Sequence, residues 1–159
     1  MKLLRTVLAT ATLALAGTAW AGALDVTFVN ADNYFDAGTS KSDERANLDA
    51  IARHLQQLAH RVLPAGHVLK VEVLDVDLAG TVKPTRRGTD LRTMRGTGDF
   101  PAIHVRYALQ APGQQLRTGE ERIRDISYTR NAVNVRSASD PLYYEKRMLE
   151  KWFEERFAS

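Results

Sequence analysis

The stretch that decides the fold is residues 68–78, VLKVEVLDVDL, which carries the strongest strand pattern in the chain. Its apolar residues follow one alternating phase as far as Val73 and the opposite phase after it. They are Leu69, Val71 and Val73, then Leu74, Val76 and Leu78. Because successive side chains of a strand point to opposite faces, the switch predicts a bulge or twist near Val73, or a strand covered on both faces.

A strand and a helix are predicted before this stretch. Residues 24–29 are rich in β-formers and predict a strand, and residues 30–38 form an acidic, turn-rich loop. Ser40 and Asp43 resemble a capping box and predict the start of an amphipathic helix of about 20 residues. The apolar face of that helix consists of Leu48, Ile51, Leu55, Leu58 and Val62.

Two further strands are predicted after residues 68–78. They follow a long connection over residues 81–100 that is rich in Gly, Thr and Arg. Residues 103–109 alternate cleanly between apolar and polar side chains and predict a half-buried strand. A turn at residues 111–114 then leads into a more polar strand over residues 115–128, in which Gly119 indicates a bulge.

The chain ends in a predicted aromatic helix. Asp140 and Pro141 are typical of an N-cap and first helical residue, and the pattern continues to Phe157. The helix carries Tyr143, Tyr144, Trp152, Phe153 and Phe157, a concentration that is typical of a core element.

The predicted element order is therefore β-α-β-β-β-α. A strand–helix–strand unit favours a parallel crossover, whereas the later hairpin is antiparallel. We expect a single α+β domain over residues 22–159, with a mixed four-stranded sheet and both helices packed on one face.

Residues 1–21 have the pattern of a secretory signal peptide. Lys2 and Arg5 precede an apolar run that is too short for a comfortable bilayer span, and Ala19-Trp20-Ala21 is an A-x-A cleavage signal. We expect cleavage after Ala21, a periplasmic location and no transmembrane span afterwards. Without Lys2 and Arg5, the 22 basic residues fall to 20 against 19 acidic ones, a net charge of +1. This balance argues against nucleic-acid binding.

Two motifs carry a family resemblance. Residues 75–80, DVDLAG, and residues 144–153, YEKRMLEKWF, resemble those of a family of small exported bacterial proteins defined only as a domain of unknown function. The likeness spans the chain from residue 26 to the final helix. It implies export and a single domain, and it assigns no activity, ligand or functional residue.

Asp75 and Asp77 form the candidate acidic site. Two residues apart on a strand, they share a face, with Cα atoms about 6–7 Å apart. Such a pair can bind a hard cation or divide acid and base roles, which is the basis of an alternative hypothesis: a metal-dependent or acid/base hydrolase, with His104 as a further participant. The structural interpretation is that both carboxylates accept backbone amides or pair with arginines where the strand ends.

The candidate ligand-binding residues are four arginines in the long connection, Arg86, Arg87, Arg92 and Arg95. Clustered guanidinium groups suit phosphates or carboxylates, because they donate paired hydrogen bonds. The leading hypothesis is thus a non-catalytic envelope module that binds an anionic envelope component or a protein partner. The alternative interpretation is that the arginines pair internally with neighbouring acids.

The sequence lacks the residues and motifs that several other common kinds of site require. The chain has no cysteine, which excludes disulfides, thiolate metal sites and thiol catalysis. It contains no H-E-x-x-H, G-x-S-x-G, S-x-x-K or Walker motif. The sequence therefore predicts no cofactor and no metal site, and it leaves the oligomeric state open.

Overall fold

The computed structural model describes residues 22–84, 90–96, 98–130 and 140–158. Its elements, in chain order, are β1 (Ala23–Phe28), η1 (Ala31–Asn33), α1 (Lys41–Val62), β2 (Val68–Asp77), β3 (Thr81–Pro84), β4 (Asp90–Thr93), β5 (Ala102–Gln110), β6 (Arg117–Arg124) and α2 (Tyr143–Phe157). None of the helices in these residues is long and apolar enough to cross a membrane.

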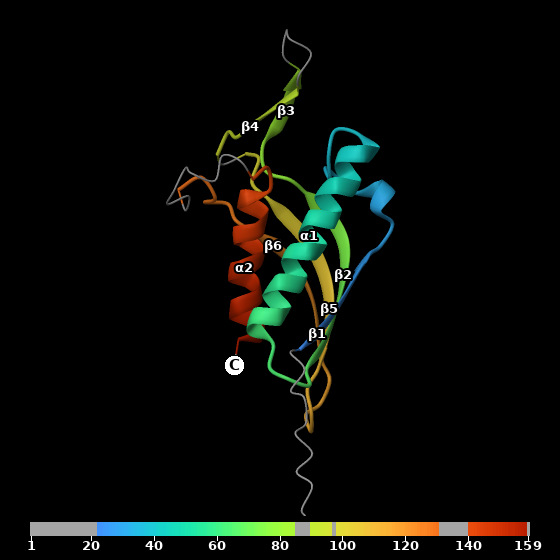
Figure 1. Ribbon diagram of the computed structural model, residues 1–159. Helices are drawn as coiled ribbons and strands as arrows, with labels where there is room; N and C mark the ends of the chain where they lie inside the picture. The colour runs from blue at the N-terminus through green and yellow to red at the C-terminus, as the bar shows by residue number, and fades with distance from the viewer. Residues whose placement is uncertain (1–21, 85–89, 97, 131–139, 159) are drawn as a thin grey trace, which may run out of the picture.

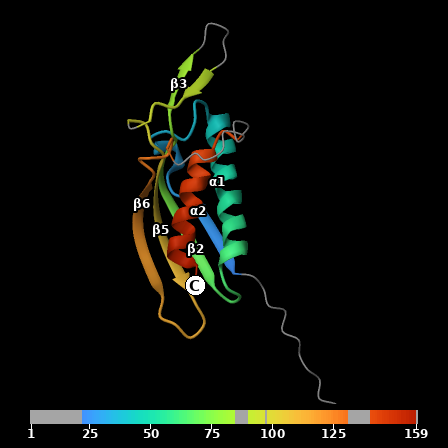
Figure 2. The ribbon, with the colours of Figure 1, turned by 90° about the vertical axis from the view of Figure 1, so that its left-hand side faces the viewer.

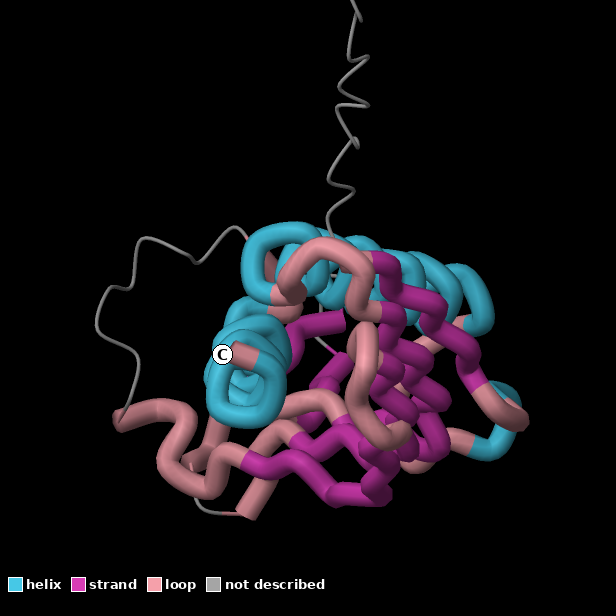
Figure 3. The backbone as a smooth tube through the Cα atoms, turned by 90° about the horizontal axis from the view of Figure 1, so that it is seen from below, coloured by secondary structure: helices cyan, strands magenta, loops and turns pink. Residues whose placement is uncertain are grey.

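The main sheet has the predicted mixed topology. Its strand order is β1-β2-β5-β6, with β1 and β2 parallel and the other two pairs antiparallel. Both helices cover the same face of this sheet, as Figures 1 and 3 show. The protein is thus a single-domain α+β fold, as the sequence predicts.

The phase switch in β2 is a bulge. The pairing of β2 with β5 shifts register between Val73 and Asp75, so the strand has one extra residue there. Val73 and Val76 are therefore both fully buried under the helices. Asp75 and Asp77 take the other phase and are half-buried. The bulge thus aims the two carboxylates away from the hydrophobic core.

α1 begins as predicted. The Ser40 hydroxyl accepts a hydrogen bond from the backbone N–H of Asp43, which satisfies one free donor of the first turn. Its predicted apolar face packs on the sheet, and Ile51 and Leu55 are completely buried. The helix ends at Val62, next to the predicted stop at residues 64–66.

α2 begins two residues later than predicted. Asp140 caps a turn instead of the helix, because its Oδ1 accepts the N–H of Leu142 at 3.0 Å. The aromatic side chains nevertheless form a core, with Trp152, Phe153 and Phe157 buried. The ring of Tyr107 on β5 meets that of Phe157 edge-on at 5.3 Å, which joins the helix to the sheet.

Residues 81–100 contain regular structure that the sequence analysis missed. β3 and β4 pair as a separate two-stranded antiparallel sheet, and this hairpin projects beyond the helices in Figure 1. Each strand has only four residues, without apolar alternation, so no pattern reveals it. At its base Gly80 has φ 84°, and an added Cβ would lie 2.8 Å from the carbonyl oxygen of Thr93.

The prediction for the last strand is also corrected. β6 spans Arg117–Arg124 rather than residues 115–128, and its pairing with β5 runs through Gly119 without a bulge. Gly119 is needed for a different reason. A Cβ there would lie 2.5 Å from the Tyr107 ring, so the glycine makes room for an aromatic side chain on the opposite strand.

The face of the sheet that the helices leave open is charged and internally paired. Arg106 on β5 donates to Glu72 on β2 at 2.9 Å and to Glu120 on β6 at 3.0 Å. The other oxygen of Glu120 lies 3.1 Å from Nε2 of His104. Opposite charges on neighbouring strands therefore alternate across this face, as in an ordinary solvated sheet surface.

Candidate functional site

The most unusual chemistry lies where β2 ends, beside the loop after β1. The backbone of Asp36 forms a bridge to β2, donating to the carbonyl of Val76 and accepting from the N–H of Leu78, both at 3.0 Å. The Tyr34 hydroxyl donates to the carbonyl of Val73 at 2.7 Å, and burial raises the pKa of Tyr34 to about 12. These contacts fix the loop against the strand and bring Asp36 beside Asp77.

Asp75 has structural partners. Its Oδ1 accepts the backbone N–H of Phe35 at 2.9 Å, and its Oδ2 lies 3.6 Å from the guanidinium of Arg122 on β6. Both contacts match the structural interpretation of a carboxylate at a strand end. The first one also determines how the exposed side chain of Phe35 is presented.

Asp77 differs from Asp75. Among the described residues, its half-buried carboxylate has neither a hydrogen bond nor a direct ion pair. Burial raises the pKa of Asp77, and the charge of Asp36 raises it further. The charge of Arg122 lowers this pKa, while Asp75 raises it and Arg92 lowers it more weakly. The described part of the sheet end therefore supplies no direct partner for the Asp77 carboxylate.

Asp77 lines an open pocket of about 370 Å³. The pocket lies between the loop after β1, the end of β2 and the first residues of β3. Its lining combines three carboxylates, two phenyl rings and two hydroxyl groups with backbone and small apolar groups. The charged and aromatic members are Asp36, Asp77, Asp99, Phe35 and Phe100. Phe35 is 79% exposed, which is unusual for a phenyl ring and places an apolar group at the pocket rim.

Asp99 is held on the opposite wall. It accepts the hydroxyl of Tyr128 at 2.7 Å and the backbone N–H of Arg95 at 2.8 Å. Burial and the hydrogen bond to Asp99 raise the pKa of Tyr128 to about 12, so this hydroxyl keeps its proton at neutral pH. Both donors are neutral, so Asp99 brings a second carboxylate charge to the pocket.

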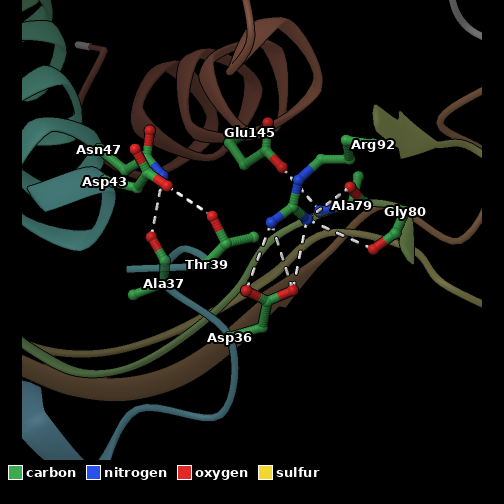
Figure 4. A network of polar contacts seen from close by, with 9 residues as sticks. All are labelled: Asp36, Ala37, Thr39, Asp43, Asn47, Ala79, Gly80, Arg92 and Glu145. Atoms are coloured by element: carbon green, nitrogen blue, oxygen red, sulfur yellow. Dashed lines mark hydrogen bonds and ion pairs between the residues drawn. The ribbon is translucent and has the colours of Figure 1, made fainter. Parts of the chain in front are cut away.

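Arg92 of β4 reaches into the base of this region (Figure 4). Its guanidinium donates to both oxygens of Asp36 at 3.3 Å, to the carbonyl of Ala79 at 3.0 Å and to that of Gly80 at 3.3 Å. The Arg92 side chain is only 19% exposed. It neutralises Asp36 and ties the hairpin to the body of the protein, because its donors reach both the loop and the end of β2.

Glu145 of α2 lies behind Arg92 and is almost completely buried. Its Oε1 accepts the N–H of Ala79 at 2.7 Å, while its Oε2 has no hydrogen-bond partner among the described residues. Burial raises the pKa of Glu145, and the nearby Arg92 charge opposes that change. Figure 4 shows the carboxyl group of Glu145 beside the guanidinium of Arg92, across from Asp36.

The family comparison gives a clear assignment. A family model described as a protein of unknown function, DUF3016, matches residues 22–155. The chain belongs to the DUF3016 family. No curated protein and no solved structure matches it at a significant level. The family match confirms the resemblance inferred from residues 75–80 and 144–153, and it assigns no ligand or reaction to this DUF3016 protein.

The four candidate arginines have different environments. Arg92 is engaged internally, whereas Arg95 is exposed, and within the described ranges only its backbone N–H has a partner, Asp99. Arg86 and Arg87 lie outside the described residues. In the described part of the DUF3016 chain, Arg92 does not line the pocket, and it acts as an internal counter-ion of Asp36, which does.

The acidic candidates are brought together, but with different roles. Asp75 and Asp77 both lie at the end of β2, and only Asp77 lines the pocket. His104 lies on the open face of the sheet beside Glu120. Within the ranges that the structure describes, no group of three or more His, Cys, Asp or Glu side chains is arranged to hold a metal ion.

The sequence analysis did not single out several residues of this region, among them Asp36, Glu145 and Phe35. Asp36 and Phe35 lie in a loop that appeared only acidic and turn-rich, and they reach β2 through a long-range bridge. Glu145 follows the two tyrosines at the start of α2, where a glutamate is an ordinary first-turn residue. Only its burial distinguishes it, and a single sequence does not reveal burial of a charged residue.

Proposed function

We propose that this DUF3016 protein is a non-catalytic binding protein that holds a cationic group in the pocket beside Asp77. The observation that carries the proposal is the half-buried Asp77 carboxylate, which lines a pocket of about 370 Å³ and has no hydrogen-bond partner among the described residues. Buried or half-buried charges are normally paired, because water no longer stabilises them fully. A cation in the pocket would supply the missing partner.

The lining favours an organic ammonium group over a bare metal ion. Phe35 and Phe100 offer ring faces and apolar contact, which suit an alkyl chain and a positive charge together. Among the residues that the structure describes, the carboxylates of Asp77 and Asp99 have no cationic partner at hydrogen-bond distance, whereas Asp36 has Arg92. The ligand class is therefore an amine on a flexible aliphatic chain, such as a polyamine or a lysine side chain.

Binding is favoured over catalysis by the roles of the two carboxylates. A hydrolase that uses Asp75 and Asp77 needs both groups to converge on a substrate with a further polar group. Asp75 is occupied by the Phe35 N–H and by Arg122, and it does not line the pocket. The metal-dependent hydrolase alternative can be tested directly. If a metal ion binds at Asp75 and Asp77, excess calcium, magnesium or manganese should raise the thermal unfolding temperature.

The proposed location is the periplasm, after removal of residues 1–21. The A-x-A signal at residues 19–21 supports this proposal. The family match also begins at residue 22, the first residue after the expected cleavage site. Mass spectrometry of the protein recovered from a periplasmic extract would show an N-terminus at Gly22, and an intact N-terminus in that extract would contradict the proposal.

Isothermal titration calorimetry with spermidine tests the cation pocket. The purified protein should bind spermidine, with an affinity that falls as salt increases. Asp77→Asn should weaken binding by about 10-fold or more, since a charge-assisted hydrogen bond contributes roughly 1.5–3 kcal/mol. Asp49→Asn, which removes the same charge from an exposed position of α1, is the matched control and should leave binding unchanged. Equal affinities for the wild type and Asp77→Asn would overturn the proposal.

An anionic envelope ligand is the second candidate function. It is favoured by Lys83 and Arg95, which are exposed on and beside the projecting hairpin. Phosphatidylglycerol vesicles should then retain the protein in a salt-sensitive way, and Arg95→Ala should weaken that retention. Equal retention by phosphatidylcholine vesicles would remove this candidate.

A further inference from the structure

β6 is an edge of the main sheet with an unpaired outer side. In the described residues its backbone pairs only with β5, and Figure 2 shows it at the side of the molecule with no strand beyond it. An edge strand of eight residues presents a row of free backbone donors and acceptors. Such an edge must be protected, or it pairs with another strand.

The sequence of this edge is complementary to itself. In an antiparallel pair of two copies centred on Glu121, Glu120 lies opposite Arg122 of the other copy, and each Arg122 lies opposite a Glu120. We propose that two copies of this chain associate through β6 in this register, so that one continuous sheet runs through both. The proposal does not depend on the cation pocket.

The register follows from the faces of the strand. A two-fold axis perpendicular to the sheet keeps the helices of both copies on one side, so opposite residues must both be even-numbered or both odd-numbered. Glu120 and Arg122 are both exposed on the open face, and each also contacts an opposite charge of its own chain, Arg106 and Asp75 respectively. If the pair were centred on residue 120, Glu120 of one copy would lie opposite Glu120 of the other. If it were centred on residue 122, the two Arg122 side chains would face each other, and in both cases like charges would repel.

The central pair is neutralised on the helix side. Glu121 lies opposite Glu121 of the second copy, and each already has a cation. Arg156 of α2 lies 2.9 Å from Oε1 of Glu121, and its guanidinium donates twice to Oε2 at 3.1 Å. The like-charge contact at the axis is therefore between two ion pairs rather than two bare carboxylates.

Residues at the ends of β6 are also complementary between the two copies. The same register brings Arg117 opposite Asp125, and Leu116 and Ile126 lie just beyond the two strand ends, Ile126 in the turn that follows β6. Leu116 is 61% exposed and Ile126 63% exposed. Two of the four exposed large hydrophobic residues of the described chain thus flank this edge, where a second copy would cover them.

Sedimentation velocity at increasing protein concentration tests the association. The wild type should form a dimer, and Arg122→Glu should raise the dimer dissociation constant at least about 10-fold, because it sets like charges opposite each other. The double variant Glu120→Arg, Arg122→Glu restores opposite charges and should restore the dimer. Arg53→Glu, the same change on the exposed side of α1, is the control and should not alter it.

A cysteine experiment tests the register without relying on charge. The chain has no cysteine, so an introduced one is unique. Glu121→Cys should form a disulfide-linked dimer on oxidation, because directly opposite Cβ atoms are about 4.5–5.5 Å apart. Thr118→Cys should not, since the two copies of residue 118 would be about 20 Å apart along the strands. A monomer at all concentrations, a dimer insensitive to Arg122→Glu, or equal cross-linking at both positions would overturn the proposal.

Discussion

The open face of the sheet and the pocket at the end of β2 use the same residue types in opposite ways. On the open face Arg106 lies between two glutamates, and Glu120 has both Arg106 and His104 beside it. In the pocket Asp77 has two carboxylate neighbours and no direct partner among the described residues. In the first arrangement each carboxylate is paired directly with a cation, whereas in the second the described residues give Asp77 no direct partner.

This difference separates a solvated surface from a candidate binding site. Exposed ion pairs contribute little to stability and need no functional explanation. A half-buried carboxylate without a cationic partner slightly lowers the stability of the fold. Such groups are found more often at functional sites, where a bound ligand can supply the opposite charge. We therefore expect substitutions in the two regions to change the free energy of unfolding by different amounts and in different directions.

The largest effect is expected for Arg92→Ala. Arg92 is mostly buried, and its loss leaves Asp36 without its counter-ion and two carbonyl groups without a donor. We expect a loss of about 2 kcal/mol in the free energy of unfolding, measured by urea denaturation. Arg95→Ala, a neighbouring exposed arginine, serves as the control. Equal effects of the two substitutions would mean that Arg92 is only another surface charge.

A smaller, pH-dependent effect is expected for Glu145→Gln. Because burial raises the pKa of Glu145, the folded protein binds its proton more tightly than the unfolded chain does. The wild type should therefore lose stability relative to Glu145→Gln as the pH rises from the ordinary glutamate value of 4.5 toward the raised folded value. Unfolding free energies measured across that range provide the test. A difference that is constant with pH would contradict it, and Glu155→Gln on the exposed side of α2 is the matched control variant.

Asp77→Asn should change stability by less, and in the stabilising direction. Its raised pKa means that ionisation above the ordinary value of 3.8 opposes folding. Removing the charge should stabilise the protein at pH 7 by roughly 0.3–0.5 kcal/mol, since solvent screens a half-exposed group. Differential scanning calorimetry at pH 7 can detect the accompanying rise in the unfolding temperature. Destabilisation by Asp77→Asn would show that the carboxylate stabilises the fold.

The smallest effect is expected for Arg106→Ala on the open face. Its guanidinium is exposed, and its ion pairs with Glu72 and Glu120 compete with water. The midpoint of thermal unfolding should stay almost unchanged and should be insensitive to salt. A loss comparable to that of Arg92→Ala would remove the distinction between the two regions.

The fold could be predicted from sequence where a local pattern determines it. The alternation in residues 68–78, the apolar face of α1 and the aromatic α2 identify the layers, because burial of one face imposes a period on the sequence. The hairpin of β3 and β4 could not be predicted, since the sequences of its short strands have no apolar alternation. Gly119 was misinterpreted because its requirement comes from Tyr107 on another strand.

The candidate site was predicted only in part. Asp75 and Asp77 were recognisable as two carboxylates at a strand end, but no sequence pattern indicates that Phe35 and Arg122 engage only the first of them. The contact of Arg92 with Asp36 joins residues 56 positions apart. Such pairings depend on how loops meet in space, and a single sequence does not encode them as a pattern.

The most direct test of the central claim is an NMR titration of the Asp77 side-chain carboxyl group, with and without spermidine. In the free protein its pKa should lie above the ordinary value of 3.8, because burial and neighbouring carboxylates oppose ionisation. Bound spermidine should lower that pKa, since a cation beside the carboxylate favours its charged form. An ordinary pKa for Asp77 that spermidine leaves unchanged would contradict the account.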